Sequence, residues 1–143
     1  MGKTALILGA TGLTGKLLLN RLLADEAYEK VKVFSRRTLG LKHPKLEVFI
    51  GDLLKLDAFD SDFIGDVAFC CTGTTANKTK DKGLYKQIDF GIPVSAAYLS
   101  KKNGINCFLV VSAIGANTES QIFYNKTKGE MEDAVLNQHI PNT

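Results

Sequence analysis

The hydrophobic positions of this chain form short apolar runs separated by longer stretches with helical spacing. Five runs have the length of β-strands, and several are apolar at nearly every position: residues 4–9, 31–35, 46–50, 66–71 and 106–111. Strands that are apolar on both faces are typical of a parallel sheet covered on both sides. The stretches that are long enough for helices are residues 14–24, where leucines recur at helical spacing, 84–102 and 122–137.

The order of these elements, strand-helix-strand-strand-strand-helix-strand-helix, predicts an α/β fold with a doubly wound parallel sheet. No internal repeat, low-complexity tract or linker interrupts the order, so residues 1–143 are interpreted as one domain. Gly91 and Pro93 fall inside the helical stretch 84–102. Because proline has no backbone N–H to donate, we expect this helix to kink or to start again near Ile92.

The first predicted strand turns into the first predicted helix through the segment GATGLTG, which has the spacing G-x-x-G-x-x-G. Without side chains, the backbone can turn tightly and approach a pyrophosphate, whose charge meets free N–H groups at the positive end of the helix dipole. Glycines alone could simply make a tight turn, but the strand before them and the helix after them favour a dinucleotide site. The sequence therefore predicts a Rossmann-type dinucleotide-binding domain over residues 1–143, with Gly9, Gly12 and Gly15 at the pyrophosphate.

Two arginines, Arg36 and Arg37, follow the second predicted strand. At this place, NAD-binding proteins usually carry an acidic residue that bonds the ribose hydroxyls of the adenosine. Two guanidinium groups would instead attract a 2′-phosphate, and they would leave a bare 2′-hydroxyl without its acceptor. We therefore predict that the cofactor is NADP(H) in preference to NAD(H). The alternative is that the arginines only solvate a loop.

Further candidate cofactor contacts follow the third and fourth predicted strands. Asp52 could accept a hydrogen bond from the adenine amino group and Leu53 could pack on the adenine face, although Asp is also an ordinary turn residue. Cys71, Thr72 and Gly73 offer small side chains and a hydroxyl where a nicotinamide ribose should pass. A polar loop that only ends the fourth strand is an equal alternative.

Tyr124 and Lys128 lie four residues apart at the head of the last predicted helix, so they share one helix face. An ammonium beside a phenol stabilises the phenolate, which makes the tyrosine a usable proton donor or acceptor in carbonyl reduction. The same lysine can hold the nicotinamide ribose. Ser112 ends the fifth predicted strand, and its hydroxyl could bond the substrate oxygen that Tyr124 protonates. The alternative is that these are ordinary helix-surface residues.

The same Tyr-x-x-x-Lys spacing also occurs at Tyr28 with Lys32 and at Tyr98 with Lys102, so position has to decide. The first pair is expected to straddle the loop into the second strand, and the second pair to lie on the helix that enters the fifth strand. Neither pair is then expected to face the carboxyl ends of the strands, whereas Tyr124 follows the fifth strand. The catalytic tyrosine is therefore predicted in the last pair.

Together these motifs resemble a known family. The segments GATGLTG, SRR, GDL, VSAIGAN and YNKTKGEME resemble the atypical branch of the short-chain dehydrogenase/reductases, and most of all its small NAD(P)H-binding oxidoreductases related to the Tat-interacting protein. The resemblance runs from about residue 4 to the end of the chain. It implies that Ser112, Tyr124 and Lys128 form the catalytic set, with Tyr124 as proton donor and Lys128 assisting it while binding the cofactor. It also implies that Thr11, Gly12, Leu13 and Thr14 hold the pyrophosphate.

The chain departs from that family in two places. Extended members carry a water-anchoring asparagine in the helix before the fifth strand, and this chain has Asp89 near that place, so its role is left open. Members also continue past the last helix into a C-terminal portion that shapes the substrate pocket, so we interpret this chain as truncated and leave the substrate unidentified. We expect apolar residues meant for that portion, including some of Met131, Val135 and Ile140, to be exposed or buried in a homodimer.

Composition limits the remaining classes of function. The net charge is only +3 and the lysines are scattered among acids, so neither a nucleic-acid nor a membrane face is predicted, while an anionic small ligand fits. Cys70, Cys71 and Cys107 lie in apolar runs without the spacing of a zinc or redox motif, so they are interpreted as buried thiols and no metal site is predicted. Because the sequence shows no secretory or membrane-spanning segment, the predicted location is the cytoplasm.

Two classes of function remain, and we favour an NADP(H)-dependent reductase of a small carbonyl compound. The alternative is a non-catalytic NADP(H) sensor or regulatory binding module, because a fold alone does not determine function. Such a module would not need Ser112, Tyr124 and Lys128. A flavin or quinone reductase on the same fold is a third alternative, which turnover with dyes and quinones instead of aldehydes would distinguish.

Overall fold

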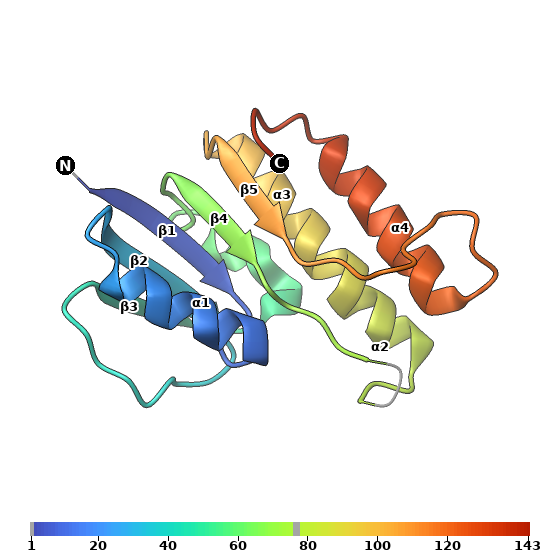
Figure 1. Ribbon diagram of the computed structural model, residues 1–143, viewed down its shortest axis with the longest axis horizontal. Helices are drawn as coiled ribbons and strands as arrows, with labels where there is room; N and C mark the ends of the chain where they lie inside the picture. Colours follow the sequence, from blue (N-terminus) through green and yellow to red (C-terminus); the bar gives the residue numbers. More distant parts are fainter. Residues whose placement is uncertain (1, 76–77) are drawn as a thin grey trace.

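The computed structural model describes residues 2–75 and 78–143 of the chain. In these ranges, parallel strands form one sheet in the spatial order β3-β2-β1-β4-β5 (Figure 1). The strands are β1 (Lys3–Leu8), β2 (Tyr28–Ser35), β3 (Leu46–Ile50), β4 (Val67–Cys70) and β5 (Cys107–Val110). The strand order reverses between β1 and β4, and ligands of doubly wound sheets bind at the carboxyl ends of the strands beside such a reversal.

Helices cover both faces of the sheet, as Figure 1 shows. The α-helices are α1 (Leu13–Ala24), α2 (Lys82–Lys86), α3 (Ile92–Lys102) and α4 (Phe123–Leu136), and there is also a 3₁₀ helix, η1 (Leu53–Phe59), and a π-helix, η2 (Gln87–Gly91). Helix α1 lies on one face, while η1, α3 and α4 pack with the other. The predicted doubly wound α/β fold is therefore confirmed.

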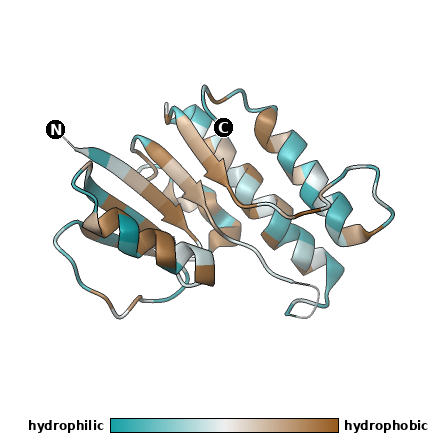
Figure 2. Ribbon diagram, in the orientation of Figure 1, coloured by the Kyte–Doolittle hydropathy of each residue, from teal (hydrophilic) through white to brown (hydrophobic). Residues whose placement is uncertain are grey.

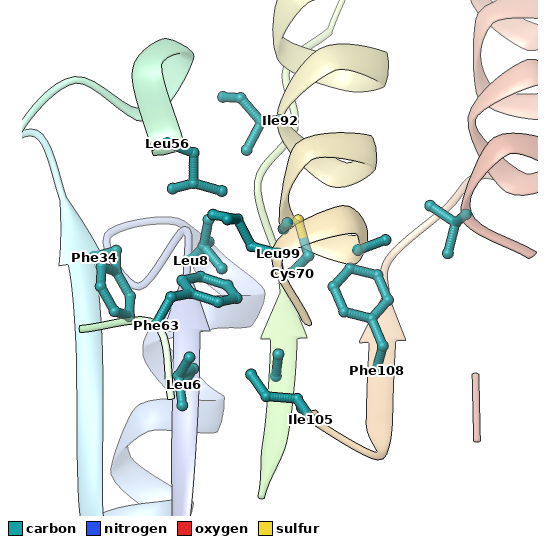
Figure 3. Packing of buried hydrophobic residues seen from close by; sticks show 14 of the residues in the cluster. Leu6, Leu8, Phe34, Leu56, Phe63, Cys70, Ile92, Leu99, Ile105 and Phe108 are labelled. Atoms are coloured by element: carbon teal, nitrogen blue, oxygen red, sulfur yellow. The ribbon is translucent and has the colours of Figure 1, made fainter. Parts of the chain in front are cut away.

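The core lies on both sides of the central strand β1, because successive side chains of a strand point to opposite faces. Ala5 and Ile7 pack in the cluster that contains the buried leucines of α1. Leu6 and Leu8 pack in the second cluster, in which Phe34, Phe63 and Phe108 are fully buried (Figure 3). The strands are hydrophobic along most of their length, whereas the helices are mixed (Figure 2). The strands could therefore be predicted from apolar runs in the sequence.

The helical stretch 84–102 breaks where the proline predicts. Helix α3 begins at Ile92, with Pro93 in its first turn, and it continues directly from the π-helix η2. The N–H of Ile92 donates to the carbonyl of Gln87, five residues back, which is the π pattern. Pro93 has no N–H for the carbonyl of Asp89, four residues before it, so a regular α-turn is lost there. The 3₁₀ helix η1 was not predicted.

One prediction about position is wrong, and one about burial holds only in part. Tyr28 and Lys32 both lie within β2 and do not straddle the loop before it, because the ladder with β1 starts at the pair Lys3 and Tyr28, ahead of the apolar run. Of the three cysteines, only Cys70 is fully buried; Cys71 and Cys107 are half-buried, and all three thiols are free. Tyr98 lies on α3, as predicted.

The expected exposure of Met131, Val135 and Ile140 is also wrong. Their side chains are 0%, 1% and 7% exposed, because α4 packs against α3 and these residues join the same core cluster as Phe108. The large exposed apolar residues include Leu109 within the edge strand β5, and Val111 and Ile114 after it.

Candidate functional site

The turn between β1 and α1 contains three glycines. The fold itself requires Gly9 and Gly15, but it has room for a side chain at Gly12. Gly9 has φ +85°, a left-handed conformation that favours glycine, and a Cβ there would lie 2.5 Å from the carbonyl carbon of Cys71. A Cβ on Gly15 would collide with the carbonyl oxygen of Gly9. A Cβ on Gly12 would meet only that same oxygen, at 3.6 Å. The space beside Gly12 is therefore open to a ligand.

Gly12 is also the N-cap of α1, so it offers no side chain to the free N–H groups of the first turn. No acidic residue lies in that turn, which leaves the positive end of the helix dipole uncompensated. Open space, free donors and a positive dipole are what a pyrophosphate needs. The residues of this turn therefore fit the phosphates of a dinucleotide.

The arginine pair lies in the same hollow as the glycine turn. One pocket is lined by Gly9, Ala10, Thr11, Phe34, Ser35, Arg36, Arg37 and Leu53. Both arginine side chains are exposed, and the buried Ser35 hydroxyl accepts a hydrogen bond from the N–H of Arg37 at 3.2 Å, which holds the turn after β2. The fold therefore brings together the residues predicted to contact the pyrophosphate and the adenosine phosphate.

Asp52 has a structural task in this fold. Its carboxylate accepts a hydrogen bond from the N–H of Leu54 at 2.9 Å and so caps the 3₁₀ helix η1. This agrees with the alternative given from the sequence, in which Asp52 is an ordinary turn residue. The predicted contact of Asp52 with adenine stays a prediction, whereas Leu53 does line the hollow.

The segment that follows β4 lies between the glycine turn and helix α4. The backbone of Cys71 and Thr72 passes directly against Gly9, and the Thr72 hydroxyl lies 3.3 Å from the Cys70 sulfur. A Cβ on Gly73 would lie 3.6 Å from Oδ1 of Asp89 and 3.9 Å from Nζ of Lys128. The predicted cofactor segment 71–73 therefore lies against the glycine turn at one end and near the predicted catalytic lysine at the other.

Lys128 and Asp89 form a buried ion pair. The Lys128 Nζ lies 3.7 Å from Asp89 Oδ2, and the two side chains are 9% and 0% exposed. Asp89 Oδ1 accepts a hydrogen bond from the N–H of Thr74 at 2.9 Å. Asp89 was noted in the sequence as a departure from the family pattern, but its pairing with Lys128 was not foreseen.

Tyr124 contacts a second tyrosine that sequence reasoning missed. Its ring meets the ring of Tyr85 edge to face, with centroids 4.7 Å apart, and Phe123 packs against both. Burial raises the pKa of Tyr85 well above its usual range, and the Asp89 carboxylate and Tyr124 raise it further. Tyr85 therefore stays protonated. Its position four residues before Asp89, in a polar helix, was the available signal.

The hydroxyl of Ser112 points to an acid on α4. Its Oγ donates to Oε1 of Glu132 at 2.6 Å. Glu132 lies four residues after Lys128, so Tyr124, Lys128 and Glu132 follow one another along one helix face. The bond from Ser112 to a substrate oxygen stays a prediction, and the sequence placed Glu132 in the family motif without giving it a role.

Gly129 lets the loop after β5 lie directly on α4. A Cβ at this glycine would be 2.5 Å from the backbone of Asn117 and Thr118. The loop is held there by the N–H of Asn117, which donates to the carbonyl of Asn125 at 3.0 Å. The loop that begins at Ser112 is thus held against the helix that carries Tyr124.

We expect Cys71 to react slowly with iodoacetamide. Burial, and then the neighbouring Cys70, raises the pKa of its thiol from 9.0 to about 11. A shift of this size leaves roughly 100-fold less thiolate than in an unperturbed cysteine at about pH 8. Alkylation followed by mass spectrometry of the peptides measures the rate, with the urea-unfolded chain as control. Equal alkylation rates in the folded and unfolded chains would contradict a raised pKa of the Cys71 thiol.

Residues 9–140 match a protein family described as NAD(P)H-binding. The chain belongs to this NAD(P)H-binding family. It is 36% identical over 137 residues to Protein HTATIP2 of Rattus norvegicus, and the matched region covers 93% of this chain and 56% of the rat protein. It is 33% identical over 146 residues to Protein FMP52, mitochondrial, of Candida albicans, which covers 96% of this chain and 62% of the relative. The chain thus spans less than two-thirds of the length of these curated relatives, and the resemblance inferred from the motifs is confirmed.

Solved structures with the same fold belong to longer proteins. Pen from Bacillus thuringiensis has a TM-score of 0.83 at 19% identity, over 99% of this chain and 48% of that one. Triphenylmethane reductase of Citrobacter sp., complexed with NADP(H), has a TM-score of 0.74 at 19% identity, over 96% of this chain and 46% of that one. At these identities, the likeness establishes the fold alone.

Two further features of the NAD(P)H-binding chain concern location and metals. No helix in the ranges 2–75 and 78–143 is both long and apolar enough to cross a membrane. In the same ranges, no three His, Cys, Asp or Glu side chains are grouped as metal ligands would be. The relative from Candida albicans is named mitochondrial, and the cytoplasmic location of this chain stays a prediction.

Proposed function

We propose that this chain is an NADP(H)-dependent oxidoreductase of the atypical short-chain dehydrogenase/reductase type, which reduces a small carbonyl compound. The observation that carries the proposal is one continuous line of residues at the carboxyl ends of the strands. It runs from the arginine pair through the glycine turn and segment 71–73 to Lys128. An extended dinucleotide needs contacts at both of its ends, and this line supplies them.

The proposed orientation places the adenosine at the arginine pair. Arg36 and Arg37 are exposed beside the glycine turn, so their guanidinium groups are free to meet a 2′-phosphate. Among the residues that the structure describes, no carboxylate lines that hollow to accept from an unphosphorylated ribose. Leu53 lines the same hollow and offers an apolar surface for the adenine. These contacts support NADP(H) over NAD(H).

At the other end, Lys128 would hold the nicotinamide-side ribose and Tyr124 would supply the proton. When bound, the reduced nicotinamide supplies the hydride that adds to the carbonyl carbon. Tyr124 donates its phenolic proton to the carbonyl oxygen, giving the alcohol, and the Lys128 ammonium stabilises the phenolate that is left. Ser112 has to exchange its bond to Glu132 for one to the substrate oxygen.

A calorimetric titration with NADPH and NADH at matched salt tests the cofactor assignment. We expect NADPH to bind and NADH to bind much more weakly. Binding of NADPH without turnover of any aldehyde or ketone would support a sensor instead of a reductase. If neither nucleotide binds, the proposed function fails.

Tyr124→Phe is expected to keep the NADPH affinity and to lose reductase activity by about 100-fold or more, because general acid catalysis contributes on that scale. Phenylalanine keeps the ring packing against Tyr85 and removes only the hydroxyl. Tyr98→Phe, which removes an exposed hydroxyl on α3, serves as the matched control and should leave the rate unchanged. Wild-type turnover by Tyr124→Phe would show that the proton has another source.

A further inference from the structure

Asp89 is a charged side chain at the base of the site to which the proposed function assigns no role. Its carboxylate is fully buried, and Oδ1 is taken by the N–H of Thr74. Oδ2 has no hydrogen-bond partner in the described part of the chain, and the ammonium of Lys128 lies 3.7 Å from it. A buried carboxylate is costly unless a cation compensates it, so this arrangement calls for a reason.

The π-helix carries this carboxylate. Asp89 lies in η2, between α2 and α3, where Pro93 removes the α-helical hydrogen-bond donor for its carbonyl. The wider turn lets the segment continue in helical form through Gly91 into α3. Short π segments of this kind occur frequently at functional sites.

Lys128 is the cation that compensates Asp89. The other titratable groups that face the carboxylate are the Tyr85 phenol from α2 and the Cys70 thiol from β4. Burial is the main cause that raises the pKa of each, so both stay neutral near neutral pH. Among the described residues that face the carboxylate, the Lys128 ammonium from α4 brings the positive charge.

The ion pair holds the Lys128 ammonium at one place beside the segment that follows β4. The position of a Cβ on Gly73 is 3.9 Å from the Lys128 Nζ, so the ammonium lies against the backbone of the segment that follows β4. A lysine side chain without a partner has a flexible four-carbon stem and would carry its charge into solvent. An ammonium has three donors, so contact with Asp89 leaves others for a ligand.

We infer that Asp89 is a positioning residue for Lys128: the buried ion pair holds the ammonium over Gly73, where it meets the ribose on the nicotinamide side of NADP(H). This inference rests on the proposed function. It makes the acid at this position an anchor for the lysine. The carboxylate then acts on the nicotinamide half of the cofactor and not on the adenosine half.

Titration with NADPH and with 2′,5′-ADP, which lacks the nicotinamide half, tests the inference. Asp89→Asn keeps the shape of the side chain and removes the charge that holds Lys128. We expect it to weaken NADPH binding about tenfold and to leave 2′,5′-ADP binding within about twofold. Asp60→Asn is the matched control, because it removes a carboxylate from a surface ion pair with Lys102, and both affinities should stay at the wild-type value.

The variant Asp89→Asn/Lys128→Met tests whether Asp89 acts through the lysine. It contains neither charge of the buried pair, so it keeps the fold even if Asp89→Asn alone leaves Lys128 uncompensated. We expect it to bind NADPH no more than about threefold more weakly than whichever single variant, Asp89→Asn or Lys128→Met, folds. A further tenfold loss would overturn the inference, because the two residues would then act independently.

The possible failures are distinguishable. If the wild-type chain binds neither NADPH nor 2′,5′-ADP, the proposed function fails. If the wild-type chain binds both and Asp89→Asn retains the wild-type NADPH affinity, the inference about Asp89 is wrong while the proposed function stands. If Asp89→Asn loses equal affinity for NADPH and for 2′,5′-ADP, the inference about Asp89 is also wrong, because such losses indicate a general structural role.

Discussion

Replacing Arg36 and Arg37 together with alanine is expected to weaken NADPH binding by about 100-fold and NADH binding by less than about threefold. Each guanidinium group can form a charge-assisted hydrogen bond with a 2′-phosphate, and each such bond contributes about 1.5 kcal/mol, or roughly tenfold in affinity. NADH carries no 2′-phosphate, so the two substitutions remove no phosphate contact from it. Calorimetric titration of the double variant with both nucleotides measures the difference.

A matched control separates this specific contact from the overall charge. Lys3→Ala/Arg21→Ala also removes two positive charges, but one lies at the first residue of β1 and the other in the last turn of α1, both away from the hollow of the arginine pair. This control should change both affinities by less than about twofold, because exposed charges at a distance are screened by salt. Equal losses of NADPH and NADH in the arginine variant would refute the 2′-phosphate assignment.

Gly12→Val is expected to abolish binding of both nucleotides while the chain stays folded. The backbone of Gly12 has φ −79° and ψ 173°, which valine also adopts, and a Cβ there meets only the carbonyl oxygen of Gly9 at 3.6 Å. Replacing a glycine N-cap by an apolar residue costs stability only on the order of 1 kcal/mol. The valine side chain would occupy the space that the pyrophosphate needs. Thermal unfolding and calorimetry of the same sample measure both effects.

Gly15→Val is the contrasting variant three residues along the same turn. Its Cβ would collide with the carbonyl oxygen of Gly9 inside the protein, so the strand and helix would have to separate. We expect a loss of about 3 kcal/mol or more in the free energy of unfolding, as for severe overpacking. A Gly12→Val chain that folds and still binds NADPH would show that the open space beside Gly12 is not the pyrophosphate site.

Most of the fold could be predicted from the sequence because its strands are short apolar runs bounded by turns. The predicted run 46–50 is the strand β3 without any change of bounds, and the break in the helix before β5 follows from Pro93 alone. The start of β2 could not be predicted, because Tyr28 joins the strand through its ladder with β1 and not through its own hydrophobicity. Burial of Met131, Val135 and Ile140 also depended on a neighbour, the helix α3.

The candidate site divides in the same way. The glycine turn and the arginine pair could be located from the sequence, because a strand, a turn and the residues just after a strand are local features whose place at the sheet edge follows from the parallel order. The ion pair of Asp89 with Lys128, the contact of Tyr85 with Tyr124 and the bond of Ser112 to Glu132 join residues at least 20 positions apart. Only the packing of α2, η2 and α4 beside β4 and β5 brings these groups together, because pairing between side chains on separate elements is decided by tertiary structure and leaves no periodic pattern along the chain.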